Sequence, residues 1–236
     1  MSTIIHRAND RGHANHGWLK ANHSFSFGQW YDPDKIQFGA LRVLNDDIVA
    51  PSTGFGRHPH DNMEIITIPL SGSLSHEDSM GNGSTISVGE VQVMSAGTGI
   101  FHTEKNASQS EEVCLFQVWI IPNKRNHEPR YDQIKFEFKA NSLTQVVSPE
   151  SDDEGTWIHQ NAWIHLAQID KNNSITYSKK DQKNGVYIMI IEGEVNILDE
   201  KLEKRDAIGI LDENETVIYA NQSVQLLIIE VPMINV

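Results

Sequence analysis

The chain has 236 residues, of which 39% are hydrophobic, and a formal net charge of −13 at pH 7. This excess of acidic residues argues against nucleic acid or an anionic membrane surface as a direct partner. No apolar run approaches the length of a membrane-spanning helix, and the N-terminal residues lack the apolar segment of a secretory signal. The single cysteine, Cys114, excludes an intrachain disulfide. We therefore expect a soluble, cytoplasmic protein that builds its own hydrophobic core.

The first 50 residues combine histidines and aromatic residues with short strand-like segments. The spacings between His13, His16 and His23 suit neither one face of a strand nor a short metal-binding clip, so we interpret them as structural histidines in loops or at a pocket rim. The alternation in SFSFGQW predicts a short strand with one buried face. Further on, ALRVLNDDIVA is interpreted as two short strands around a turn at residues 45–47.

Two pairs of potential metal ligands follow. GFGRHPH places His58 and His60 on either side of one proline, and IFHTEKN places His102 and Glu104 on either side of one threonine. On a β-strand, residues i and i+2 project to the same face, so each pair can direct both side chains at one point. Two such strands facing each other would supply three imidazoles and one carboxylate, a set suited to a divalent transition metal. Glu64, four residues after His60, remains an alternative carboxylate on geometric grounds.

Between the two pairs, the sequence predicts only short strands and tight turns. EIITIPL and SLSHED flank a turn at Ser71-Gly72, Gly81-Asn82-Gly83 predicts a hairpin turn, and STISVGEVQVMSA is interpreted as two strands. For His76, within SLSHED, we expect a cross-strand hydrogen bond rather than metal ligation. Closely spaced short strands without helical periodicity indicate an all-β sandwich or barrel.

The second half repeats this character without the pattern of metal ligands. IIEGEVNI resembles PLSGSLSH, which suggests duplication of one β unit, but SKKDQKN and VIYAN stand where the ligand pairs of the first half would fall. The residues before this half are charged and contain prolines. We therefore predict a metal-binding domain over residues 1–122, a connection over 123–150, and a C-terminal domain over 151–236 that lacks metal ligands.

The motifs resemble those of a known protein family. The glycine-rich approach to His-x-His and the series Gly89, Gly97 and His102-x3-Asn106 resemble the two motifs of the cupin superfamily. The blocks RGHANHGWL, HSFSFGQWYDP, GFGRHPHDNMEIIT, HEDSMGNGS and QVMSAGTGIFHTEKN are similar to the pirin family, and most similar to bacterial pirin-like proteins with quercetin 2,3-dioxygenase activity. The resemblance is dense from residue 6 to about residue 122 and loose in the C-terminal half.

The pirin resemblance implies both a fold and a metal site. The implied fold is an all-β bicupin of two stacked β-barrels, of the double-stranded β-helix or jelly-roll type, with few short helices. The implied metal is one divalent transition metal in the N-terminal barrel, iron(II) first, with manganese, nickel, cobalt, copper or zinc as alternatives. Its ligands correspond to His58, His60, His102 and Glu104, whereas Glu64 is not a ligand in the pirin pattern.

The resemblance also implies an activity. The family reaction is the 2,3-dioxygenation of a flavonol such as quercetin, which consumes dioxygen and releases carbon monoxide. Glu104 could serve as the catalytic base, and the flavonol rings would contact a set of aromatic side chains: Phe25, Phe27, Trp30 and Phe55. One alternative is a regulatory pirin that binds a partner protein, with the metal as a switch and no catalytic role. Another is a metalloprotein that acts on a different small molecule.

Overall fold

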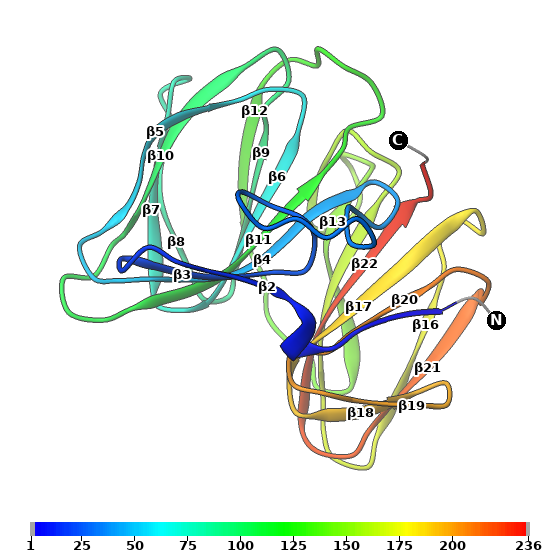
Figure 1. Cartoon of the computed structure of the whole chain (residues 1–236). Helices are drawn as coiled ribbons and strands as arrows, with labels where there is room; N and C mark the ends of the chain where they lie inside the picture. Colours follow the sequence, from blue (N-terminus) through cyan, green and yellow to red (C-terminus); the bar gives the residue numbers. More distant parts are fainter. Residues whose placement is uncertain (1–2, 235–236) are drawn as a thin grey trace.

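A computed structural model describes residues 3–234 of the protein, and its regular secondary structure there is almost entirely β-strand. The strands form two similar halves, and each half combines a seven-stranded sheet with a four-stranded sheet (Figure 1). Within residues 3–234 the only helix is a 3-10 turn, η1 (Ala8–Asp10), and no helix there is long and apolar enough to cross a membrane. The predicted all-β architecture is confirmed, and the expected short helices amount to this one turn.

The first half contains the candidate metal ligands. Its seven-stranded sheet has the order β12-β9-β6-β11-β4-β3-β2, and its four-stranded sheet has the order β5-β10-β7-β8. The strands are β2 (Gly12–Asn15), β3 (Leu19–His23), β4 (Leu41–Val49), β5 (Gly54–His60), β6 (Glu64–Ser71), β7 (Ser73–Asp78), β8 (Gly83–Ser87), β9 (Glu90–Ser95), β10 (Ile100–Asn106), β11 (Val113–Ile120) and β12 (Arg130–Lys135).

The second half repeats the arrangement. Its seven-stranded sheet has the order β1-β20-β17-β22-β15-β13-β14, and its four-stranded sheet has the order β16-β21-β18-β19. The strands are β1 (Thr3–His6), β13 (Ser142–Ser148), β14 (Thr156–Trp157), β15 (Trp163–Ile169), β16 (Ser174–Ser178), β17 (Asn184–Glu192), β18 (Glu194–Ile197), β19 (Glu200–Glu203), β20 (Ala207–Ile210), β21 (Glu215–Ala220) and β22 (Val224–Pro232).

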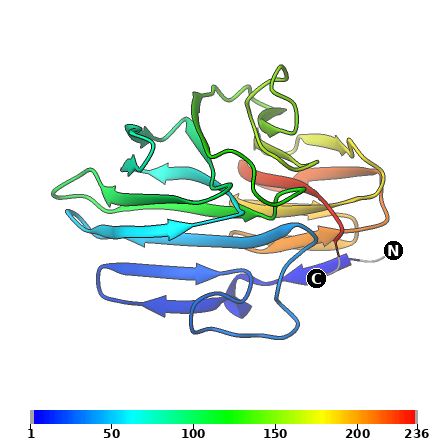
Figure 2. The ribbon, with the colours of Figure 1, turned by 90° about the horizontal axis from the view of Figure 1, so that it is seen from above.

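The chain passes between the halves more than once. Strand β1 pairs with β20 in antiparallel register, from Thr3 opposite Ile210 to His6 opposite Ala207, so the first strand completes a sheet of the second half. In Figure 2 this blue strand leads away from β2 and β3 toward the C-terminal half. The predicted connection, residues 123–150, contributes β12 to the first half and β13 to the second.

The two halves pack through their seven-stranded sheets. One hydrophobic cluster contains Leu44 and Phe116 from the first half together with Tyr187 and Leu227 from the second, all buried. A second cluster fills the interior of the C-terminal half with buried aliphatic side chains such as Ile188. The interior of the first half holds only two smaller apolar clusters. The first half therefore has space between its two sheets for polar groups.

Strand β4 differs from the prediction of two strands around a turn. It continues without interruption through residues 45–47 and pairs with β3 on one side and with β11 on the other. Two polar side chains of this segment have partners: Asn45 Oδ1 lies 2.8 Å from His23 Nδ1 on the neighbouring strand β3, and Asp46 Oδ2 lies 2.8 Å from Arg205 Nε in the second half. Pairing within the sheet thus overrides the turn preference of the Asn-Asp-Asp sequence.

The strand predicted for SFSFGQW is also wrong. The only ladder contact of this segment is an isolated bridge between Phe27 and Trp30. These two residues exchange both backbone hydrogen bonds, at 3.1 Å each, around a tight turn that contains Gly28 with φ of 59°. Glycine accepts this left-handed conformation without steric cost. The segment is therefore a rigid loop with an aromatic side chain on each side of its turn.

Candidate metal centre

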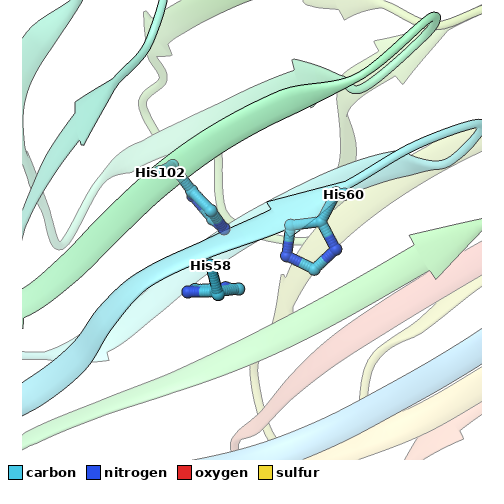
Figure 3. A group of neighbouring side chains, drawn as sticks. All are labelled: His58, His60 and His102. Carbon is cyan, nitrogen blue, oxygen red and sulfur yellow. The ribbon is translucent and has the colours of Figure 1, made fainter.

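Strands β5 and β10 bring three histidines to one place on the four-stranded sheet of the first half. His58 lies directly opposite His102, and His60 lies opposite Ile100 in the same antiparallel pair. Directly opposed residues project to one face, and so do residues i and i+2. One nitrogen from each of the three rings lies within 4.8 Å of the other two, and Figure 3 shows the rings converging from the two neighbouring strands. The spacing of the histidine motifs thus corresponds to an observed cluster.

The protonation and hydrogen bonding of the histidine rings leave ring nitrogens available as metal ligands. His58 Nδ1 lies 2.7 Å from the carbonyl oxygen of Gly56, and since a carbonyl only accepts, this nitrogen carries the proton and leaves Nε2 free. Both ring nitrogens of His102 are buried and have no hydrogen-bond partner within residues 3–234. Burial, reinforced by the neighbouring histidines, lowers the pKa of His60 to about 4 and that of His102 to about 2. These two rings are therefore neutral at pH 7, as metal ligation requires.

Glu104 lies beside the cluster but outside the 4.8 Å group. It shares the inward face of β10 with His102 and lines the same cavity. Its Oε1 accepts a hydrogen bond of 2.7 Å from Gln117 Nε2 on β11. Burial raises its pKa to about 7, although the hydrogen bonds from Gln117 and Thr67 oppose this increase. A cation in the cavity would favour the ionised carboxylate.

The alternative carboxylate, Glu64, points elsewhere. On β6 its neighbour Ile65 lines the cavity, so strand alternation directs Glu64 to the opposite face. There it is buried and accepts a hydrogen bond of 2.6 Å from Ser95 Oγ. Burial raises its pKa to about 7, and the bond from Ser95 opposes this increase. The geometric alternative of Glu64 as a ligand is therefore wrong for this conformation.

The histidines open into a cavity of about 270 Å³ with mostly apolar walls. Phe27 and Phe55, two of the four predicted substrate contacts, line it. The other two do not. Phe25 is only 1% exposed and packs against His6 and Tyr187 in the core between the halves, and Trp30 lines a neighbouring hollow instead. The prediction for these two residues rests on aromatic character alone, and that signal does not specify which way a loop residue points.

Several residues that line the cavity lie outside the sequence motifs and were not predicted. The wall also includes His23, Asn45, Asp47, Gln117 and Trp119, which come from β3, β4 and β11. Burial, reinforced by Glu104 and Asp46, raises the pKa of Asp47 to about 8. Polar residues in otherwise apolar strands were the available signal, because a polar side chain inside a sandwich usually faces a site.

His76 also departs from the prediction. Its ring is fully buried, and neither nitrogen has a hydrogen-bond partner in the described residues, so the predicted cross-strand hydrogen bond is wrong. The ring stacks on Tyr131 with centroids 5.0 Å apart and lies 5.2 Å from the ring of His102. His76 lies opposite Glu104 in the pair of β7 and β10, so it shares the inward face of the sheet as an aromatic neighbour of His102.

Comparison with known proteins assigns the chain to a family. Residues 5–120 match the family model described as Pirin. The chain is 40% identical over 228 residues to a protein named quercetin 2,3-dioxygenase from Escherichia coli K12, an alignment that covers 97% of this chain and 98% of the relative. The chain belongs to the pirin family. Residues 145–231 match the model described as the quercetinase C-terminal cupin domain, which confirms the two-domain cupin architecture.

Other pirins extend this comparison. A pirin-like protein from Caulobacter vibrioides is 38% identical over 222 residues, covering 93% of this chain and 95% of the relative. The crystal structure of the bacterial pirin YhhW from Escherichia coli, in complex with nickel(II), has a TM-score of 0.94 and 38% identity and covers 99% of this chain and all of that one. The histidine cluster described above, together with this nickel-bound pirin, supports a divalent metal in the first half of the fold.

Proposed function

We propose that this pirin is a metal-dependent dioxygenase that catalyses the 2,3-dioxygenation of a flavonol such as quercetin, with release of carbon monoxide. The observation that carries the proposal is the convergence of three imidazoles on an apolar, aromatic-walled cavity that also contains a buried carboxylate. Two relatives from Escherichia coli at 40% identity bear the name quercetin 2,3-dioxygenase, which supports the same assignment.

The proposed ligands are His58, His60, His102 and Glu104, and iron(II) is the proposed native metal. The donor set fits a divalent ion, because three neutral imidazoles and one carboxylate neutralise half of its charge and leave positions for exchangeable ligands. The partnerless nitrogens of His102 support this assignment, since a buried polar atom without a partner is costly unless it serves a ligand. When bound, the metal supplies Lewis-acid activation of the flavonol 3-hydroxyl and 4-carbonyl group.

The chain itself supplies binding, orientation and proton transfer. Phe27, Phe55 and Trp119 provide aromatic surfaces for a planar substrate, and the apolar wall excludes water from it. Glu104 is the proposed base for the 3-hydroxyl proton, because it is a buried carboxyl that lines the cavity beside the histidines. Gln117 holds that carboxylate in place through its 2.7 Å hydrogen bond.

The test is anaerobic reconstitution with iron(II), followed by addition of quercetin, oxygen-uptake measurement and carbon monoxide detection. His58→Ala and Glu104→Ala are assayed beside the unmodified protein, with His13→Ala as a matched control, because His13 is an exposed histidine that bonds only Asn22. We expect carbon monoxide release that disappears in the first two variants and persists in the control. Metal binding without any turnover of quercetin would overturn the dioxygenase proposal and favour the regulatory alternative.

A further inference from the structure

A second hollow lies beside the metal cavity and shares a wall with it. Its volume is about 430 Å³, and its lining includes Trp30, Tyr31 and Arg42. Phe27 and Trp119 belong to both linings, and their rings meet edge to face with centroids 5.4 Å apart. This aromatic pair therefore separates two ligand-sized spaces.

The aromatic walls of the hollow are held rigidly. Phe27 and Trp30 are locked together by the two backbone hydrogen bonds across their turn. The ring of Trp30 also lies directly on the backbone of Gly12, where an added Cβ would come within 2.1 Å of the ring. A ligand that stacks here does not have to order these side chains, which reduces the entropic cost of binding. The hollow is thus preorganised for a planar ring.

Arg42 adds a positive charge to the hollow, and only one of its guanidinium nitrogens donates hydrogen bonds within the described residues. Its Nη1 donates to the carbonyl oxygens of Ser26, at 2.9 Å, and Ile36, at 3.1 Å, which holds the guanidinium at the hollow. Within residues 3–234, Nε and Nη2 have no hydrogen-bond partner, and no carboxylate lies within 4.0 Å of the group. The nearby Lys35 is already paired with Asp32 at 3.5 Å. A guanidinium with two free N–H directions is suited to a carboxylate.

We propose that this hollow is a binding site for a planar aromatic carboxylate, whose ring stacks against the aromatic walls and whose carboxylate pairs with Arg42. Tyr31, whose side chain is 72% exposed at the rim, closes over the outer face of the ring. The site lies apart from the histidine cluster and does not depend on dioxygenase activity, so its test measures binding rather than turnover.

The first experiment compares 4-hydroxybenzoate with its uncharged analogue 4-hydroxybenzamide by isothermal titration into nickel-loaded protein. We expect one site that binds the acid at least tenfold more tightly than the amide, since a charge-assisted pair forms only with the acid. Equal affinities for the two probes, or no binding of the acid, would overturn the proposal. This comparison needs no mutation and is independent of any folding defect.

Variants then locate the site. Arg42→Gln is expected to abolish the preference for the acid, and Tyr31→Ala to weaken both probes several-fold without affecting the fold, because Tyr31 is exposed. Arg57→Gln is the matched control, because this arginine lies over the ring of Phe101, at 3.9 Å, and outside the hollow. His58→Ala should leave the acid preference unchanged. Loss of that preference in His58→Ala, with retention in Arg42→Gln, would place the probe in the metal cavity and refute the proposal.

Discussion

Replacing Glu104 with glutamine measures how far the buried, ionised carboxylate lowers the free energy of unfolding. In the metal-free protein, burial raises the pKa of Glu104 from 4.5 to about 7. The folded state therefore binds the proton more tightly than the unfolded chain, and the associated stabilisation is present below pH 4.5 and lost as the pH rises to 7. The pKa of Glu104 differs by about 2.5 between the folded and unfolded states. Because one pKa unit corresponds to ~1.36 kcal/mol, this difference lowers the free energy of unfolding by about 3 kcal/mol at high pH.

The Glu104→Gln variant should recover that amount above pH 8, because glutamine keeps the acceptor for Gln117 and cannot ionise. The expected result for chelator-treated protein is a melting temperature about 6–12 °C above that of the unmodified protein at pH 8.5, and a much smaller difference at pH 5. Thermal unfolding followed by circular dichroism measures it. Glu77→Gln, an exposed carboxyl on the neighbouring strand β7, is the control and should change little.

Adding nickel(II) should reverse the order of stability. The unmodified protein gains stability by binding the ion, whereas the glutamine variant gains less because its side chain carries no charge. The reasoning would be refuted if metal-free Glu104→Gln were no more stable than the unmodified protein at pH 8.5. It would also be refuted if the gain were the same at both pH values, because the carboxyl charge would then not be its cause.

Three further predictions concern the surroundings of the site. Gln117→Leu removes the donor that orients the cavity carboxylate and should weaken nickel(II) binding about 10–100-fold in a competition titration, while the fold persists. Asp46→Ala leaves both Arg11 and Arg205 without their carboxylate partner. It should lower the free energy of unfolding, measured by urea denaturation, by about 3–5 kcal/mol, and an unchanged urea midpoint would contradict this. Gly97→Ala should reduce the melting temperature and the yield of folded protein, because φ is 49° and the added Cβ would lie 2.1 Å from the carbonyl oxygen of His127.

The sequence was most informative where the β period of two acts on chemistry-bearing residues. The pairs around Pro59 and Thr103 have alternating side chains, so the histidine cluster could be predicted once both segments were taken as strands. The choice between Glu64 and Glu104 could not be made in this way, because Glu64 begins a new strand after the loop at residues 61–63. Which face that strand presents depends on its pairing with β9 and β11, and this pairing is tertiary information.

The loop aromatics and the polar residues of β4 were less predictable for a related reason. Phe25 and Phe27 look equivalent in sequence, yet one lies in the core between the halves and the other in the cavity wall. The Asn-Asp-Asp segment has turn-forming composition, and only its partners in β3, β11 and the second half explain an extended conformation. In both cases the deciding contacts join segments that are far apart along the chain, so local sequence patterns do not predict them.

The pairing of β1 with β20 also has a consequence for how the protein is made. Strand β1 is synthesised long before its partner β20, so this pairing cannot form until residue 210 has left the ribosome. Strand β1 must remain without its partner until then, and its docking is a late step of folding. A gene divided after residue 122 would therefore separate β1 from the sheet in which it pairs.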